Sequence, residues 1–511
     1  MLDILIIGAG PAGIQASYFL KKHGISHKIL EKGQRPGAFF EQYPRHRMLI
    51  SINKKYTGSD HPEFNLRHDW NSLLSSEGPK FTEYDDDLFP AADSLLKYLD
   101  DFVAQENIDI TYNAEVSCID KEHGHFVVTL TDGSKHEAKN VIVATGFNLT
   151  NKPQVEGIEY AEDYSVMSVD KKDFINKRVL VIGKGNSAFE TADHLAGVTS
   201  LIHMISPTPT RLAWQTHYVG NLRAVNNNIL DMYQLKSQHA ILDATIDKIS
   251  KEGDKYRVDI SYAHAEGETE TLYYDTILCC AGFKLDNSIF SESCMPVTVM
   301  NGKYPQLSTG YESVNVPGLY FAGTLTHAHD YRKGTSGFIH GFRYNVQALT
   351  NILNHRLNNA EIDHKKIKRD VSDVTHYLLN RFNVVSSIWQ QPSILAEVFK
   401  ITDDNVEHYE AMPVNYAVED YFNKDDVVLI TFEYGDHIEG DIFKQARIAR
   451  DNFANSQQSQ FLHPVLRFYS QGKLTEEFHV IEDLEANWTV EEHYDHISSF
   501  ISKVMREMAY E

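Results

Sequence analysis

Residues 2–13 read Leu2-Asp3-Ile4-Leu5-Ile6-Ile7-Gly8-Ala9-Gly10-Pro11-Ala12-Gly13, an aliphatic run followed at once by a glycine-rich turn. The run predicts a buried strand, and the residues from Pro11 to Lys22 predict a helix. Gly8 would make the tight turn, Gly10 would let a pyrophosphate approach the backbone, and Gly13 would let the helix pack closely. The helix N-terminus would offer N–H groups to the phosphates. This stretch therefore predicts a dinucleotide-binding βαβ unit.

Two further residues indicate which dinucleotide this first unit binds. Glu31 follows the next apolar run, 18 residues after Gly13, and would accept hydrogen bonds from an adenosine ribose. Pro11 at the helix start is more typical of flavoproteins than of simple dehydrogenases. FAD is therefore the predicted ligand of the first unit.

A second copy of the pattern begins at Arg178 and contains Gly183-Lys184-Gly185-Asn186-Ser187-Ala188. Alanine in the third glycine position is a permitted variant. The next apolar run, 201–206, lacks an acidic residue at its end, and Arg211 follows it. This combination favours a nucleotide with a 2′-phosphate, so NADPH is predicted over NADH. Two nucleotide sites in one chain indicate that hydride passes from NADPH to FAD.

Other segments complete the predicted flavin site. Ala144-Thr145-Gly146 and Ala281-Gly282 end apolar runs in equivalent places of the two units. Gly323-Thr324 ends a later run, and Ser336-Gly337-Phe338 precedes a helix whose N-terminus would favour the negative charge of reduced flavin. Between them lie His327, His329, Asp330 and Arg332, which would orient a substrate or an oxygen adduct. No metal site is predicted, because this cluster has no third ligand at a set spacing.

The order of these segments predicts an α/β fold. It comprises two Rossmann-like dinucleotide-binding domains, the second inserted in the first, and a C-terminal α+β domain. The expected boundaries are 1–165 and 285–358 for the FAD-binding domain, 166–284 for the NAD(P)H-binding domain, and 359–511 for the C-terminal domain. In the last we expect helices over 374–382, 393–399 and 490–508, and strands over 427–434 and 465–469. No motif assigns this domain a role.

Composition excludes several classes of partner. The 511 residues include 48 Lys+Arg against 71 Asp+Glu, a net charge of −23, which argues against a nucleic acid. No apolar run reaches the roughly 18 residues that span a bilayer, so no membrane partner is expected. The N-terminus lacks the features of a secretory signal, residues 508–511 form no retention signal, and the four cysteines include no C-x-x-C pair. We therefore expect a cytoplasmic protein without an internal dithiol relay. The sequence does not determine the oligomeric state, and a homodimer is one possibility.

Longer strings of residues resemble known flavoproteins. The two glycine loops and Ala144-Thr145-Gly146 resemble the flavin-containing monooxygenases. The strings at 43–47, 51–54, 64–71 and 337–344 resemble the FAD-dependent oxidoreductase domain-containing protein 2 family, nearly from end to end of the chain. The resemblance implies that Gly37-Ala38-Phe39-Phe40 is a flavoprotein segment and that Asn53 faces the flavin. It also implies that 186–188 bind NADPH. The Baeyer–Villiger fingerprint does not occur, so ketone insertion is not expected.

The sequence and this resemblance predict an FAD-dependent NAD(P)H oxidoreductase. The predicted reaction is oxygenation by O2 of a nitrogen or sulfur centre in a small-molecule substrate, through a C4a-(hydro)peroxyflavin. The catalytic candidates are Asn53, Lys54 and His327. Two alternatives are a reductase of a disulfide or quinone, and an FAD-containing binding protein whose C-terminal domain recruits a protein partner.

The residues predicted to bind FAD or NADPH lie in the loops and strand ends described above. They are Gly8, Gly10, Pro11, Ala12, Gly13, Glu31, Lys32, Gly37, Phe39, Phe40, Arg47, Ser51, Asn53, Ala144, Thr145, Gly146, Gly183, Gly185, Asn186, Ser187, Ala188, Arg211, Gly282, Gly323, Thr324, Ser336, Gly337 and Phe338.

Overall fold

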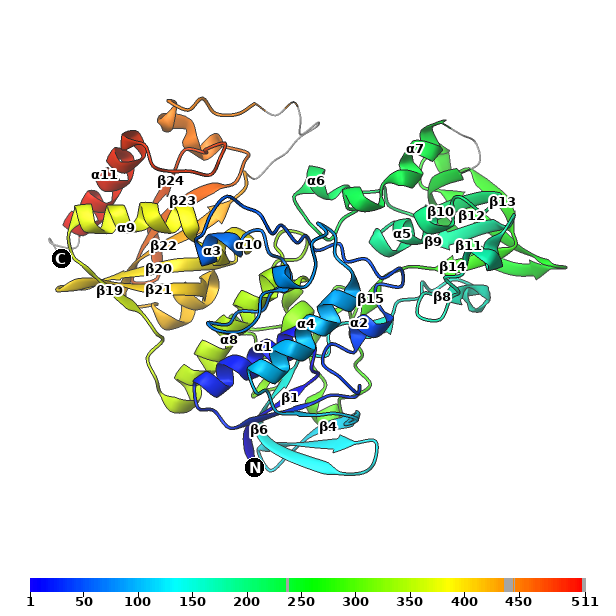
Figure 1. The fold of residues 1–511 in the computed structure, drawn as a ribbon, viewed down its shortest axis with the longest axis horizontal. Helices are drawn as coiled ribbons and strands as arrows, with labels where there is room; N and C mark the ends of the chain where they lie inside the picture. Colours follow the sequence, from blue (N-terminus) through cyan, green and yellow to red (C-terminus); the bar gives the residue numbers. More distant parts are fainter. Residues whose placement is uncertain (236–238, 436–443, 445, 508–511) are drawn as a thin grey trace.

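Three lobes make up the chain in this computed structural model, which describes residues 1–235, 239–435, 444 and 446–507. In the view of Figure 1 the first lobe lies at the bottom, the second at the upper right and the C-terminal lobe at the upper left. The predicted fold class is confirmed: two Rossmann-like lobes are followed by an α+β lobe. Residues 508–511, including the expected end of the last helix, lie outside the described residues.

The first lobe is built on a seven-stranded sheet of order β3-β2-β1-β6-β5-β4, with β18 also paired to β6. Strands β1, β2, β3, β6 and β18 are mutually parallel, whereas β4 and β5 form an antiparallel hairpin with β6. The strands are β1 (Leu2–Ile7), β2 (His27–Leu30), β3 (Ile110–Thr111), β4 (Val116–Glu122), β5 (His125–Leu130), β6 (Lys135–Val143) and β18 (Leu319–Phe321).

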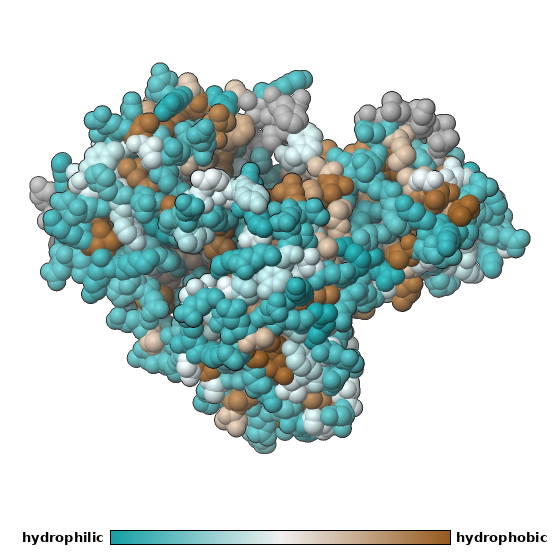
Figure 2. Space-filling view, in the orientation of Figure 1, coloured by the Kyte–Doolittle hydropathy of each residue, from teal (hydrophilic) through white to brown (hydrophobic). Residues whose placement is uncertain are grey.

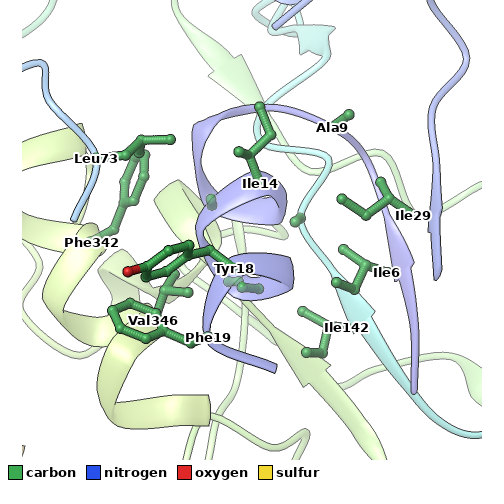
Figure 3. Close-up of a cluster of buried hydrophobic side chains, with 14 of the residues drawn as sticks. Ile6, Ala9, Ile14, Tyr18, Phe19, Ile29, Leu73, Ile142, Phe342 and Val346 are labelled. Carbon is green, nitrogen blue, oxygen red and sulfur yellow. The ribbon is translucent and has the colours of Figure 1, made fainter. Parts of the chain in front are cut away.

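Three helices cover one face of this sheet: α1 (Pro11–Lys22), α4 (Ala92–Gln105) and α8 (Ile339–Asn358). Figure 3 shows α1 between the sheet and α8. Ile6 and Ile142 of the strands lie on one side of it, and Phe342 and Val346 lie on the other. These side chains are almost completely buried, so the helix that follows the first glycine loop is fixed by packing on both sides.

The second lobe has another seven-stranded sheet, of order β13-β12-β11-β10-β9-β14-β8. All its strands fall between β6 and β18 in chain order, so the second lobe is an insertion in the first. Its strands are β8 (Glu162–Asp163), β9 (Arg178–Ile182), β10 (Leu201–Ser206), β11 (His239–Glu252), β12 (Lys255–Tyr262), β13 (Thr269–Tyr274) and β14 (Thr276–Cys279). Its helices are α5 (Asn186–Leu195), α6 (Ala213–Thr216) and α7 (Asn228–Leu235).

The C-terminal lobe is an antiparallel six-stranded sheet of order β19-β21-β20-β22-β23-β24. Helices α9 (Val371–Val384) and α11 (Glu491–Glu507) cover one face, and the other face packs against Ile352 of α8. The strands are β19 (Lys365–Lys368), β20 (Leu395–Ile401), β21 (Asn405–Pro413), β22 (Asp426–Glu433), β23 (His463–Ser470) and β24 (Lys473–His479). The expected helix over 393–399 is wrong, because these residues enter β20, an interior strand.

Short elements complete the lobes and their junctions. The helices are α2 (Phe39–Gln42), α3 (Pro62–Asn65), α10 (Ser387–Gln390) and the 3₁₀ segment η7 (Gly323–Ala328); the strand pairs are β7 (Leu149–Thr150) with β15 (Phe283–Lys284) and β16 (Thr298–Val299) with β17 (Tyr304–Pro305). Hydrophilic residues dominate the face in Figure 2, and hydrophobic ones form small separate patches. None of the helices in the described ranges has both the length and the apolar character that crossing a membrane requires.

Candidate functional site

The first glycine loop joins β1 to α1. Two of its glycines are required by packing, and the third faces open space. Gly8 has φ +102, and a Cβ there would lie 2.8 Å from the carbonyl oxygen of Ala144. A Cβ on Gly13 would lie 2.0 Å from the carbonyl oxygen of Gly8. Gly10 has an ordinary φ of −72, and no atom lies within 4 Å of a Cβ placed there. Packing therefore requires Gly8 and Gly13, whereas Gly10 faces open space at the N-terminus of α1.

Glu31 fixes this loop from the end of β2. Its Oε2 accepts a hydrogen bond from the Ala9 N–H at 2.6 Å, and its Oε1 accepts one from the Gly33 N–H at 2.7 Å. The side chain is buried, yet each carboxylate oxygen has a second lone pair. Glu31 can therefore hold the loop and still accept a hydrogen bond from a ligand hydroxyl.

The second glycine loop repeats this geometry between β9 and α5. Gly183 has φ +125, and a Cβ there would lie 2.3 Å from the carbonyl oxygen of Cys280. A Cβ on Gly185 would again meet no atom within 4 Å. Cys280 is thus the counterpart of Ala144. Each follows a strand and has its carbonyl oxygen close to the first glycine of the loop.

Ser206 takes the place of Glu31 in the second lobe. The Gly8 N–H donates to the Leu30 carbonyl, and Glu31 follows Leu30. In the same way, the Gly183 N–H donates to the Ile205 carbonyl, and Ser206 follows Ile205. Arg211 is exposed on the cleft wall described below and has no carboxylate partner in the part of the chain that the structure describes. A hydroxyl followed by a free guanidinium suits a 2′-phosphate better than a carboxylate would.

Both loops line one cleft of about 1250 Å³ between the first and second lobes. Most of the predicted site residues line it. They are Gly8, Gly10, Pro11, Ala12, Glu31, Lys32, Phe39, Phe40, Ser51, Ala144, Thr145, Gly146, Gly183, Gly185, Asn186, Ser187, Arg211, Gly282, Gly323, Thr324, His327, Gly337 and Phe338.

The remaining predicted residues do not line the cleft: Gly13, Gly37, Arg47, Asn53, Lys54, Ala188 and Ser336. Asn53 is buried and donates its side-chain N–H to the Asp85 carbonyl at 2.7 Å, while Lys54 is exposed. Arg47 pairs with Asp93 at 2.5 Å. Of the three catalytic candidates, only His327 lies at the cleft.

Two side chains in the cleft have buried polar atoms with no hydrogen-bond partner among the described residues: Asn71 Oδ1 and Thr324 Oγ1. Asn71 is 1% exposed, and its amide N–H group donates to the Ile52 carbonyl at 3.2 Å. Leaving such atoms unpaired costs free energy, which a polar ligand in the cleft would recover. Sequence reasoning missed Asn71, whose only signal is its place in the resembling string 64–71.

A hydrogen-bonded chain crosses the cleft at the junction of the two lobes. Nδ1 of His327 lies 2.7 Å from Asp330 Oδ1, and Nε2 lies 2.8 Å from the hydroxyl of Tyr218. Asp330 Oδ2 also accepts the Ser336 N–H at 2.9 Å, as expected of a carboxylate. Nδ1 therefore donates, and Nε2 of a neutral imidazole accepts the Tyr218 O–H. Burial and the Asp330 carboxylate raise the pKa of Tyr218, so its hydroxyl keeps its proton.

Gln391 of the C-terminal lobe is hydrogen-bonded to the segment 335–336, next to this hydrogen-bonded network. Its Nε2 donates to Ser336 Oγ at 2.9 Å and to Asn345 Oδ1 at 2.7 Å, and its Oε1 accepts the Thr335 N–H at 3.0 Å. Gln391 is completely buried. The segment that carries Gly337 and precedes α8 is thus fixed by a residue from outside the first and second lobes.

Asn186, which lines the cleft, also positions a neighbouring loop. Its side chain donates to the Asn221 carbonyl at 2.8 Å and accepts the Arg223 N–H at 2.9 Å. It therefore positions the loop that carries Tyr218. His217 of the same loop stacks on Tyr434 of the C-terminal lobe, with ring centroids 4.3 Å apart. The loop therefore touches all three lobes.

Glu190 of α5 gives the cleft a pH-dependent group, since burial raises its pKa from 4.5 to about 7. Its raised folded-state pKa contributes stability that is fully present below about pH 4.5 and is lost as pH rises through about 7. We expect Glu190→Gln to abolish this loss and to raise the free energy of unfolding at pH 8 by up to about 3 kcal/mol. Urea unfolding at pH 4.5 and pH 8 measures it, with the exposed Glu159→Gln as control. The same pH dependence in both variants would contradict the assignment.

Comparisons with known proteins agree with this architecture. Residues 5–323 match the family model described as pyridine nucleotide-disulphide oxidoreductase, which stops before α8. The chain is 34% identical to FAD-dependent oxidoreductase domain-containing protein 2 of Mus musculus, over 95% of this chain and 81% of that protein. The fold is similar to that of bacillithiol disulfide reductase from Staphylococcus aureus (TM-score 0.52, 19% identity) and of a flavin-containing monooxygenase from Stenotrophomonas maltophilia (TM-score 0.53, 19% identity). Each similarity covers 70% of this chain and 99% of the other.

Proposed function

The chain belongs to the FAD-dependent oxidoreductase domain-containing protein 2 family, within the pyridine nucleotide-disulphide oxidoreductases, and from this premise we propose that it is an NADPH-dependent flavin monooxygenase. NADPH, H⁺, O2 and a nitrogen- or sulfur-containing small molecule would give NADP⁺, water and the oxygenated product. The observation that carries the proposal is that two glycine loops line one cleft, together with His327 and its hydrogen-bonded partner Tyr218.

The residues of the first lobe fit FAD. The open face of Gly10 and the N-terminus of α1 would receive the pyrophosphate, and Glu31 would bind the ribose. The unpaired Asn71 Oδ1 and Thr324 Oγ1 would gain polar partners. When bound, FAD would accept a hydride and transfer two electrons to O2. Gly185, Ser206 and Arg211 would hold NADPH in the second lobe.

His327 would receive and return a proton near the reacting atoms, with Tyr218 as its hydrogen-bond donor. In the arrangement described above, Tyr218 donates to Nε2 while Asp330 keeps the proton on Nδ1. Tyr218, whose raised pKa keeps its hydroxyl protonated, therefore orients His327, and Nε2 of His327 is the proton acceptor of the pair. Both side chains are largely withdrawn from water, which limits the loss of reactive species to solvent.

The cysteines favour a small-molecule acceptor over an internal dithiol relay. Cys279 and Cys280 are buried at the end of β14, and Cys280 lines the cleft. Burial raises the pKa of both thiols, so neither is a thiolate near neutral pH. Dithiol exchange requires a thiolate to attack, and these two residues do not provide one.

The decisive experiment is anaerobic reduction of the FAD-loaded protein by NADPH, followed by a pulse of oxygenated buffer. We expect bleaching of the flavin band by NADPH. After the pulse, we expect an oxygen-dependent absorbance phase that outlasts mixing before the oxidised spectrum returns. Rapid reoxidation by a disulfide or a quinone, with no such phase, would favour the reductase. Absence of bleaching would reject both enzymatic functions.

Arg211→Ala tests the preference for NADPH. Loss of a guanidinium contact to the 2′-phosphate should weaken NADPH binding by about 1–3 kcal/mol and leave NADH binding unchanged. Tryptophan fluorescence titrations with NADP⁺ and NAD⁺ provide the measurement. Equal weakening for both nucleotides would show that Arg211 does not contact the 2′-phosphate.

A further inference from the structure

Two cations at the His327 end of the cleft have no role in the scheme above. Lys303 and Arg332 both line the cleft, and neither pairs with a carboxylate within the described ranges. Elsewhere in the cleft, Lys184 pairs with Asp243. Lys303 and Arg332 therefore form a local positive site in a chain of net charge −23.

Aromatic rings form the walls around these cations. Lys303 Nζ lies 5.4 Å from the ring centroid of Tyr304, 5.9 Å from that of Tyr331 and 5.8 Å from that of Phe147. The Arg332 guanidinium carbon lies 5.1 Å from the centroid of Tyr331. We call these five residues the cationic vestibule.

The vestibule adjoins the proton-transferring group. The rings of Tyr304 and Tyr331 each lie with their centroids 5.8 Å from that of His327. A molecule seated against these rings would therefore extend from the two cations toward His327. The vestibule adjoins His327, whereas Glu31 and Arg211, the residues expected to bind the adenosine ends of the two cofactors, lie elsewhere on the cleft wall.

Holding the Lys303 ammonium here is unfavourable without an anion. Burial, with Arg332 nearby, lowers the pKa of Lys303, so its ammonium group is poorly compensated. Arg332 has φ +62, a left-handed conformation that costs free energy for a residue with a Cβ. The turn that imposes this conformation is fixed by hydrogen bonds from the Lys333 and Gly334 N–H groups to the Asp330 carbonyl, at 2.8 and 3.0 Å.

We propose that Lys303 and Arg332 bind the carboxylate of the substrate, and that Tyr304, Tyr331 and Phe147 contact its apolar or aromatic body. This inference rests on the proposed function, because it specifies the class of molecule oxidised there. The substrate is thus a small organic carboxylate, with its nitrogen or sulfur centre directed toward His327. A cation paired with a carboxylate and flanked by flat rings selects both charge and shape.

Binding of benzoate, with its neutral isostere benzamide as the matched ligand, tests the proposal. Calorimetric titration of the oxidised FAD-loaded protein requires no turnover, and the visible flavin spectrum reports whether the ligand lies near the flavin. We expect saturable binding of benzoate with a spectral change, and binding of benzamide weaker by roughly tenfold or more, as for a lost charge-assisted hydrogen bond.

Variants identify the cations responsible. Lys303→Met and Arg332→Met should each raise the Kd of benzoate by roughly tenfold or more and leave that of benzamide unchanged. Lys333→Met, at an exposed neighbour that does not line the cleft, is the matched control and should bind as the native chain does. Arg211→Ala should weaken NADP⁺ binding without affecting benzoate.

Three outcomes would overturn the proposal. The first is equal binding of benzoate and benzamide, and the second is no loss of benzoate affinity in the two methionine variants. The third is a matching rise in the Kd of NADP⁺ in those variants, which would assign the cations to the nucleotide phosphates. Failure of NADPH to bleach the flavin, with benzoate binding intact, would instead reject the monooxygenase and leave the carboxylate site standing.

Discussion

Gly10→Val is expected to give a folded protein that purifies without yellow colour. A Cβ at this position meets no atom of the chain within 4 Å, and its φ of −72 suits any L-residue, so the substitution should not strain the fold. The added isopropyl group would instead fill the space in front of the α1 N-terminus, which FAD requires for its pyrophosphate. We expect loss of nearly all bound FAD, measured by the absorbance of the purified protein near 450 nm.

Gly185→Val is the matched variant in the second loop, because a Cβ there also points into open space. It should remain yellow but lose reduction by NADPH. Gly197→Val is the control: this exposed glycine after α5 has no atom within 4 Å of a Cβ and does not line the cleft. It should retain both FAD and reduction. A yellow Gly10→Val protein with full FAD content would show that the flavin lies elsewhere.

The glycine loops could be predicted because their geometry is local. The positive φ values of Gly8 and Gly183 and the close packing of Gly13 on the Gly8 carbonyl lie within one strand–turn–helix unit each, although Ala144 and Cys280, which also require Gly8 and Gly183, come from distant strand ends. Glu31 was predicted from the same unit. Such features leave a signal in sequence spacing, because the same short segment that carries the residue also determines where it points.

The middle of the cleft could not be predicted, since long-range contacts assemble it. Tyr218 comes from the second lobe, His327 from the first and Gln391 from the C-terminal lobe, yet they belong to one hydrogen-bonded network. No spacing rule connects them. Asn53 and Asn71 illustrate the same limit: both lie in resembling strings, but only Asn71 lines the cleft.

The error at 393–399 has a different cause. Charged Glu397 and Lys400 interrupt the apolar residues of β20 three positions apart, a spacing that is compatible with one face of a helix. Strand β20 lies between β21 and β22, and both of its faces are covered, so it shows no alternation of polar and apolar residues. Packing decided this element, and packing is not visible in one short segment.

Asp330→Asn should slow turnover by roughly 100-fold while leaving FAD content and flavin reduction by NADPH unchanged. Asp330 Oδ2 accepts the Ser336 N–H, so the amide oxygen of asparagine would take this position and its N–H group would face His327 Nδ1. Nδ1 would then have to accept, which moves the imidazole proton to Nε2. Tyr218 could no longer donate to Nε2, and Nε2, already protonated, could no longer accept a proton.

The position of that proton can be measured directly. Nitrogen-15 NMR of labelled histidine should report a protonated Nδ1 on His327 in the native chain and a protonated Nε2 in Asp330→Asn. His329→Gln is the control, because His329 is a neighbouring histidine that does not line the cleft, and it should change neither turnover nor the His327 signal. A proton shift without slower turnover would mean that His327 binds substrate without transferring protons. Slower turnover with the native tautomer would assign Asp330 to fixing the turn that carries Arg332 and Gly334.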